Sequence, residues 1–298
     1  MVRCPYPERF AILSWMVSVS YGDSGAGGCL QFRLRRAAMA RIDMHAMSPA
    51  FLKCWEAAGR HLDTQVPGGI TTWLRGQPTP PILEHLSFRL SNQLFFIRVE
   101  DVDDTVDGPS SLHELYLIAE SCQGHACVMP MKQTLFGDGW VADAPGWGLV
   151  DAKSRKPINP IELVTDEKIE MTRWELQDFA VQVVRDQLLK DNYQLMSWQG
   201  NPDVDPALWF VGKNKKPEWV VVRTVRYPEK KAVLPVNWDA IVADCSHMGQ
   251  IGHFASVAFT SIDDPFDPSG ALYRGHGIDV EYEGLDPLFT FGRFLGTA

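Results

Sequence analysis

Apolar residues in the second half of the chain recur with two periods, which predict helices and strands in a defined order. From Thr172 to Lys190 the apolar positions follow helical spacing, and Thr172 with Glu175 forms a capping-box pattern at its start. β-Branched and aromatic runs predict strands at 193–198, 208–211, 218–227, 253–262 and 277–282, with a second helix over 237–248. This order is α-β-β-β-α-β-β, and a helix between two strands implies a crossover between parallel strands.

The preceding part of the chain repeats this order. Helices are expected at 50–64 and 110–122, and strands near 69–75, 84–90, 93–101, 125–132 and 146–151. Residues 125 positions apart match: Trp73 with Trp198, and Arg98 with Arg223, the latter pair inside apolar runs. Further matches in the same order pair Pro81 with Pro206, Leu83 with Leu208, Trp55-Glu56 with Trp174-Glu175, Ile118–Cys122 with Ile241–Cys245, and Gly124-His125 with Gly252-His253.

These matches predict an internal duplication. We expect an α/β (α+β) protein of two pseudo-repeated αβββαββ units with mixed sheets, over residues 47–160 and 161–298, joined by the polar segment Lys156–Glu170. Residues 1–46 carry six arginines, no lysine and three acidic residues, unlike the remainder. We expect a disordered extension there or a misassigned start, with a signal peptide around 10–20 as the alternative.

Charge and cysteine content narrow the function classes. The chain has a net charge of −9, and residues 47–298 alone carry −12. This disfavours a broad electrostatic grip on nucleic acid. No apolar run reaches the ~18 residues that a membrane span needs. Six irregularly spaced cysteines in a long chain favour free thiols in the cytoplasm over a disulfide framework.

The unit over 170–287 resembles the restriction-endonuclease-like fold, in particular its Mrr-type branch, and the part over 50–155 resembles it more faintly. In that family a helix with an early Glu precedes a hairpin with an Asp. A central strand follows that ends in an acid or Gln, any residue, then Lys. Glu175 and Asp205 match the first two positions, whereas Val221 and Arg223 stand where the acid and the Lys are expected. In the first copy the corresponding positions hold Pro80, Phe96 and Arg98.

These departures bear on catalysis, because valine cannot ligate Mg²⁺ and arginine stays protonated. We therefore expect a non-catalytic binding protein on a degenerate nuclease-like scaffold, with a protein partner and no cofactor. The first alternative is a Mg²⁺-dependent nuclease with a migrated site made of Glu175, Asp205, Glu218 and Arg223. The second is a binder of the secretion-chaperone or immunity type.

Two further groups of residues are candidate sites. Arg98 and Arg223 lie within apolar strands, where a charge needs a partner. They predict either a pair of related ligand-binding sites or arginines paired with nearby acids such as Glu100. Cys122, His125 and Cys127 form C-x2-H-x-C, but no C-x2-C pair accompanies them, so we expect buried side chains rather than a zinc site.

Overall fold

The computed structural model describes residues 48–289, apart from 75–84, 107, 109–110, 135–138, 264–266 and 268. The chain divides into Met1–Ala46 and Met47–Ala298. The extension expected over 1–46 therefore lies outside the described residues, and so do Pro80, Pro81 and Leu83 of the predicted repeat.

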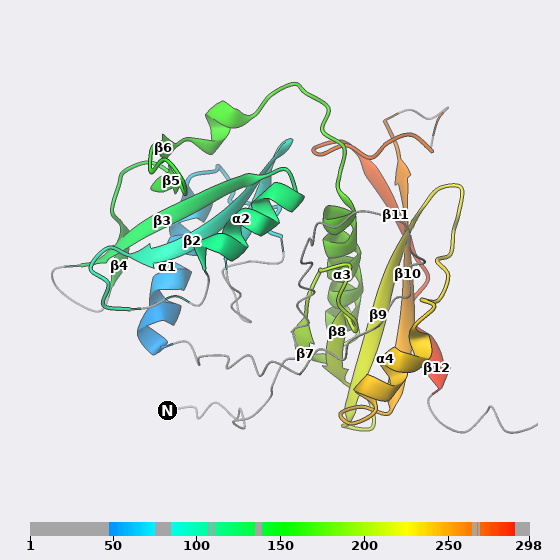
Figure 1. The fold of residues 1–298 in the computed structure, drawn as a ribbon. Helices are drawn as coiled ribbons and strands as arrows, with labels where there is room; N and C mark the ends of the chain where they lie inside the picture. Colours follow the sequence, from blue (N-terminus) through cyan, green and yellow to red (C-terminus); the bar gives the residue numbers. More distant parts are fainter. Residues whose placement is uncertain are drawn as a thin grey trace, which may run out of the picture. The chain divides into compact units, whose positions relative to one another are not determined.

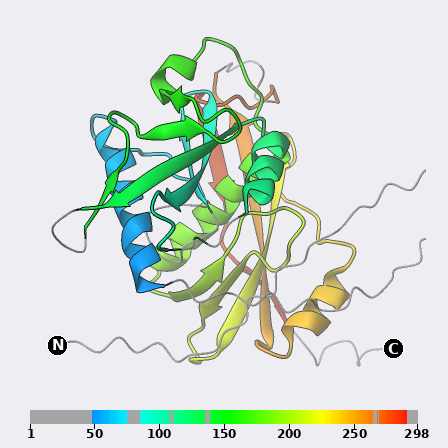
Figure 2. The same ribbon diagram turned by 60° about the vertical axis from the view of Figure 1, so that its left-hand side comes forward.

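The first of the two repeated units, over residues 47–160, is a mixed sheet with a helix on each face (Figures 1 and 2). Its central strands β2 and β3 are parallel, and the other pairings are antiparallel. The order across the sheet is β1-β2-β3-β5-β6, and β4 pairs with β3. The elements are α1 (Pro49–Thr64), β1 (Leu86–Leu90), β2 (Gln93–Asp101), α2 (Leu112–Ser121), β3 (His125–Gln133), β4 (Trp140–Ala142), β5 (Leu149–Asp151) and β6 (Pro157–Ile158).

The second unit has the same plan. Its central strands β9 and β10 are parallel, the order is β11-β10-β9-β8-β7, and β12 pairs with β10. Figure 1 shows α3 lying along one face of this sheet. The elements are α3 (Arg173–Lys190), β7 (Gln194–Trp198), β8 (Leu208–Val211), β9 (Pro217–Arg226), α4 (Trp238–Cys245), β10 (Ile251–Ser261), β11 (Ile278–Tyr282) and β12 (Asp286–Phe289).

The predicted fold class is confirmed. The protein is mixed α/β, with two mixed six-stranded sheets that fit a duplication. The short strands β4, β6 and β12 were not predicted, although β5 and β8 are equally short and were. The linker prediction over Lys156–Glu170 was wrong at its start, since β6 pairs with β5 and a 3₁₀ turn occupies Pro160–Leu163.

The strand register identifies equivalent positions in the two units. One row of residues crosses each sheet from strand to strand. In the first unit it runs Trp73–Phe88–Phe95–His125, and in the second Trp198–Leu208–Val220–His253. The two tryptophans and the two histidines paired by sequence therefore occupy equivalent places. Arg98 and Arg223 also correspond, since each lies three residues further along its central strand.

Three of the sequence matches were wrong in register: those of Leu208, of Pro206 and of Asp205. Leu208 corresponds to Phe88 rather than to Leu83, because two residues separate Leu90 from its partner Gln93, whereas seven separate Phe210 from Glu218. By the same offset, the position corresponding to Asp205 is His85 rather than Pro80.

The match of Trp55 with Trp174 also fails. The two helices begin after equivalent caps, Ser48 and Thr172. Trp55 therefore lies in the middle of α1, whereas Trp174 is the second residue of α3.

Alternation along the central strands divides the core into two layers in each unit. On β2, Phe95, Ile97 and Val99 pack with α1, while Leu94 and Phe96 pack with α2. On β9, Val220 and Val222 pack with α3, while Trp219 and Val221 pack with α4. Since Arg98 and Arg223 continue the second series on each strand, they extend from the α2 and α4 faces.

Candidate functional site: three carboxylates in ion pairs

Asp205 and Arg223 form a two-pronged ion pair in the second unit. Arg223 Nη1 donates to Asp205 Oδ1 at 2.8 Å, and Nη2 donates to Oδ2 at 2.5 Å. Their side chains are 12% and 24% exposed. Two parallel charge-assisted hydrogen bonds hold the planar guanidinium flat against the carboxylate. The aspartate predicted as a metal ligand is thus bound by Arg223.

Glu218 is engaged differently, by a histidine on the neighbouring strand. Its Oε2 lies 2.7 Å from His253 Nε2, with both side chains about as buried as Asp205. The absence of a side chain at Gly212 leaves space for this carboxylate, since a Cβ at that position would lie 1.9 Å from Glu218 Oε1. His253 Nδ1 is buried and has no hydrogen-bond partner among the described residues.

Glu175 serves two structural roles at the start of α3. It accepts hydrogen bonds from the backbone N–H and hydroxyl of Thr172, at 2.9 and 3.0 Å, and so completes the predicted capping box. Arg274 donates to both of its oxygens, from Nε at 2.9 Å and from Nη2 at 2.8 Å. The two side chains are 2% and 0% exposed.

Arg274 also binds the C-terminal end of α2. Its Nη2 also donates to the carbonyl oxygen of Cys122, and its Nη1 donates to that of Gln123 at 3.1 Å. Carbonyl groups at a helix C-terminus are left without intrahelical partners, and they favour a nearby cation. Glu175 is therefore half of a buried structural ion pair.

The first unit holds an uncharged version of the Glu218–His253 pair. Gln93 and His125 occupy the equivalent positions, and Gln93 Oε1 lies 2.9 Å from His125 Nε2. Burial lowers the pKa of His125, and the positive charge of Arg274 lowers this pKa further. Glutamine cannot compensate a proton on the ring, so this pair is suited to a neutral imidazole.

The predicted ligand site at Arg98 is occupied by an acid of its own unit, Glu100. Arg98 Nε lies 3.3 Å from Glu100 Oε1, and Arg155 Nη1 lies 2.9 Å from Glu100 Oε2. Both arginines of the predicted pair of sites therefore lie against carboxylates, as the alternative interpretation expected. In the first unit the acid, Glu100, lies on the same strand as Arg98, whereas in the second unit Asp205 lies in the connection before β8.

The migrated nuclease site does not assemble. Glu175, Asp205 and Glu218 each bind a different basic residue, and no group of three or more His, Cys, Asp or Glu side chains that could hold a metal occurs in the described part of the chain. The C-x2-H-x-C residues likewise form no such group. Burial raises the pKa of the Cys122 thiol to about 12 and raises that of Cys127 as well.

Arg274 and Gln93 are the residues that the sequence interpretation missed. Gln93 lies 125 positions before Glu218, so the repeat offset contained the signal for its pairing with His125. Arg274 offered no comparable signal, because its partner Glu175 is 99 residues away and belongs to no shared motif.

Comparison with known proteins concerns the second unit. The profile of a family described as a Domain of unknown function (DUF8840) matches residues 174–288, from the start of α3 to the last strand. No curated protein and no solved structure matches the chain. None of the described helices combines the length and apolar character that a bilayer crossing requires. The chain is thus similar, over its second unit, to a family whose function is itself unassigned.

Proposed function

We propose that the protein is a non-catalytic, cytoplasmic binding protein, in which two degenerate copies of a nuclease-like module serve to bind another protein. The observation that carries this proposal is that each candidate catalytic carboxylate is bound by a basic residue of its own. Glu175 binds Arg274, Asp205 binds Arg223, and Glu218 binds His253. A Mg²⁺ site needs several oxygen ligands that converge on one point, and these ion pairs draw the three carboxylates to separate partners.

Charge and thiol chemistry support the partner and the compartment. Residues 47–298 carry a net charge of −12, which opposes binding to the nucleic-acid backbone. Cys54, Cys122, Cys127 and Cys245 are free and buried, as expected in a reducing compartment. Binding to a protein surface requires neither a positively charged surface on this chain nor a bound metal.

The test combines a cleavage assay with a direct measurement of metal binding. Wild-type protein is incubated with single- and double-stranded DNA and RNA in the presence of Mg²⁺ or Mn²⁺, and MnCl₂ is titrated into it in a calorimeter. We expect neither cleavage nor saturable heat. Asp205→Ala is the informative variant, and Lys216→Ala, on an exposed turn, is its matched control. Metal-dependent cleavage that persists in Lys216→Ala and disappears in Asp205→Ala would overturn the proposal.

A further inference from the structure

The strand β11 ends the second sheet and contains three residues whose backbone groups no described strand pairs. It pairs with β10 on one side only. The carbonyl of Phe259 in β10 accepts a hydrogen bond from the N–H of Tyr227, so the backbone groups of Phe259 point toward β9 and not toward Val280 opposite. Phe259 and Val280 are therefore a non-hydrogen-bonded pair. By the alternation of an antiparallel ladder, Ile278, Val280 and Tyr282 direct their N–H and C=O groups away from β10.

The other edge strands carry features that hinder pairing. The strands β4 and β6 have three and two residues, and β6 and β12 contain Pro157 and Pro287. The ladder of β7 is bulged between Leu195 and Ser197, and β1 is bridged on its outer side by Trp73. Short length, proline and bulges are devices by which proteins protect edge strands. With five residues, no proline and no bulge, β11 is the edge of the described sheets best suited to accept another strand.

The side chains of β11 form an apolar face and an acidic face. Ile278, Val280 and Tyr282 are partly buried and pack against the core layer that also contacts α3. Asp279 and Glu281 are exposed on the opposite face and have no ion-pair partner among the residues that the structure describes. Asp279 Oδ1 accepts the backbone N–H of Val280 at 3.0 Å, so a side chain takes the place of a strand at this donor. An added strand would extend the apolar layer on one face and meet two negative charges on the other.

We propose that β11 is the docking site for a partner protein that adds an extended segment, in which lysine or arginine alternates with apolar residues. This proposal rests on the binding function proposed above. Main-chain hydrogen bonds to Ile278, Val280 and Tyr282 supply affinity, and the alternating side chains supply specificity, as is general for strand addition. Basic side chains opposite Asp279 and Glu281 form cross-strand ion pairs. The net charge of −12 on residues 47–298 attracts such a segment.

The same charges disfavour the other occupants of this edge. Pairing β11 with β11 of a second copy would bring Asp279 and Glu281 of both copies to one face of the joined sheet, where like charges repel. An acidic segment would meet the same repulsion. Lys231 does not relieve it, because its Nζ lies 2.7 Å from Asp286 Oδ2 and is already engaged there. A basic segment is therefore the occupant that the side chains of β11 favour.

The experiment uses the full chain and a synthetic peptide of alternating lysine and valine, S-K-V-K-V-K-V-S, with blocked ends. Fluorescence polarisation of the labelled peptide measures binding, and amide hydrogen exchange locates it. We expect saturable binding in the micromolar range and slower exchange over residues 278–282 when the peptide is bound. A peptide with the same residues in blocks, S-K-K-K-V-V-V-S, has the same charge without the alternation and should bind about tenfold more weakly.

Variants then separate the charges of β11 from its backbone groups. Asp279→Lys/Glu281→Lys should weaken binding of the lysine peptide about tenfold at low salt, and should bind instead a peptide with glutamate in place of lysine. Val280→Pro removes an outward N–H but no hydrogen bond to β10, and should weaken binding of the lysine peptide about tenfold. Asp239→Lys/Asp244→Lys, at exposed positions on α4, makes the same change in net charge and should alter binding less than about twofold. Circular dichroism checks that each variant folds.

Several results would overturn the docking site. They are no saturable binding of the alternating peptide, equal binding of the block peptide, or unchanged affinity in Asp279→Lys/Glu281→Lys. Slow exchange over residues 278–282 in the protein alone would show that the edge is already covered. A dimer that Val280→Pro dissociates in analytical ultracentrifugation would assign the edge to a second copy. Each of these results refutes the docking site and leaves the binding function standing, whereas cleavage lost in Asp205→Ala would refute the binding function itself.

Discussion

Replacing Arg274 by methionine should cost about 3–5 kcal/mol of unfolding free energy, because it leaves Glu175 as an uncompensated buried charge. Both side chains are essentially shielded from water, at 0% and 2% exposure, so no solvent replaces the lost partner. Two charge-assisted hydrogen bonds to Glu175 disappear, at 2.9 and 2.8 Å, and the carbonyls of Cys122 and Gln123 lose their donor. The capping bonds from Thr172 remain, which keeps the loss within this range.

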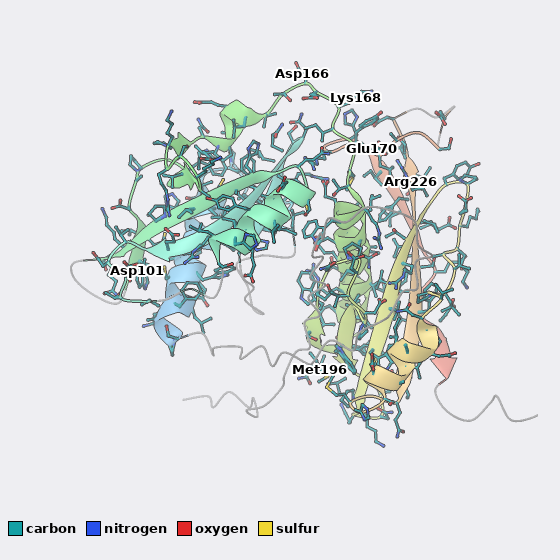
Figure 3. All side chains as sticks on the ribbon, viewed as in Figure 1. Asp101, Asp166, Lys168, Glu170, Met196 and Arg226 are labelled. Carbon is teal, nitrogen blue, oxygen red and sulfur yellow. The ribbon has the colours of Figure 1, made fainter. Side chains whose placement is uncertain are left out.

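The assay is urea unfolding followed by tryptophan fluorescence, with an exposed ion pair of the same unit as the matched control. Arg226 Nη1 lies 3.2 Å from Glu170 Oε1, the two side chains are 41% and 55% exposed, and Figure 3 shows both residues. Arg226→Met should cost only about 0–1 kcal/mol. The double variant Glu175→Gln/Arg274→Met should recover at least about 1 kcal/mol relative to Arg274→Met, because glutamine keeps the cap without the charge. If Arg274→Met costs no more than Arg226→Met, the argument from burial is refuted.

Three further predictions concern titratable groups. Glu218→Gln reproduces the pair of the first unit and should cost about 1 kcal/mol in urea unfolding, whereas Glu218→Ala should cost more; equal losses would contradict the role of the hydrogen bond that glutamine retains. Because the folded-state pKa of His125 lies below 6.5, the unfolded chain takes up the proton first, so stability should fall as the pH drops through 6.5. His125→Gln should flatten that part of a stability–pH profile, and an unchanged profile would contradict this. Burial raises the pKa of Cys54, Cys122 and Cys245 to about 12, so maleimide should label them only after denaturation, and rapid labelling of any of these three thiols in the native protein, located by peptide mapping, would contradict their burial.

Much of the architecture could be predicted from the sequence because the long elements carry strong periodic patterns. The central strands β2 and β9 were predicted to within a residue or two. The matched residues Trp73 and Trp198 occupy equivalent positions in the two sheets, and so do His125 and His253. The position of β1 relative to β8 could not be predicted, because the offset there depends on hairpin length rather than on periodicity.

The candidate site was harder to predict than the fold. The sequence identified Glu175, Asp205, Glu218 and Arg223, but it did not reveal which basic residue each carboxylate would bind. Those partners come from other elements: Arg274 from the connection before β11, and His253 from β10. Pairing of this kind depends on tertiary placement, for which a local pattern carries no information.

In each unit, the row of paired residues that leads from the tryptophan to the histidine constrains the lengths of the connections around β1 and β8. Between Phe210 and Glu218 the second unit has five more residues than its counterpart, and between Trp198 and Leu208 it has five fewer. These two differences cancel, so that the interval from Trp73 to Phe95 equals the interval from Trp198 to Val220. The longer hairpin loop after β8 is therefore offset by a shorter connection before it, and the central strand lies at the same distance along the chain from the tryptophan in both units.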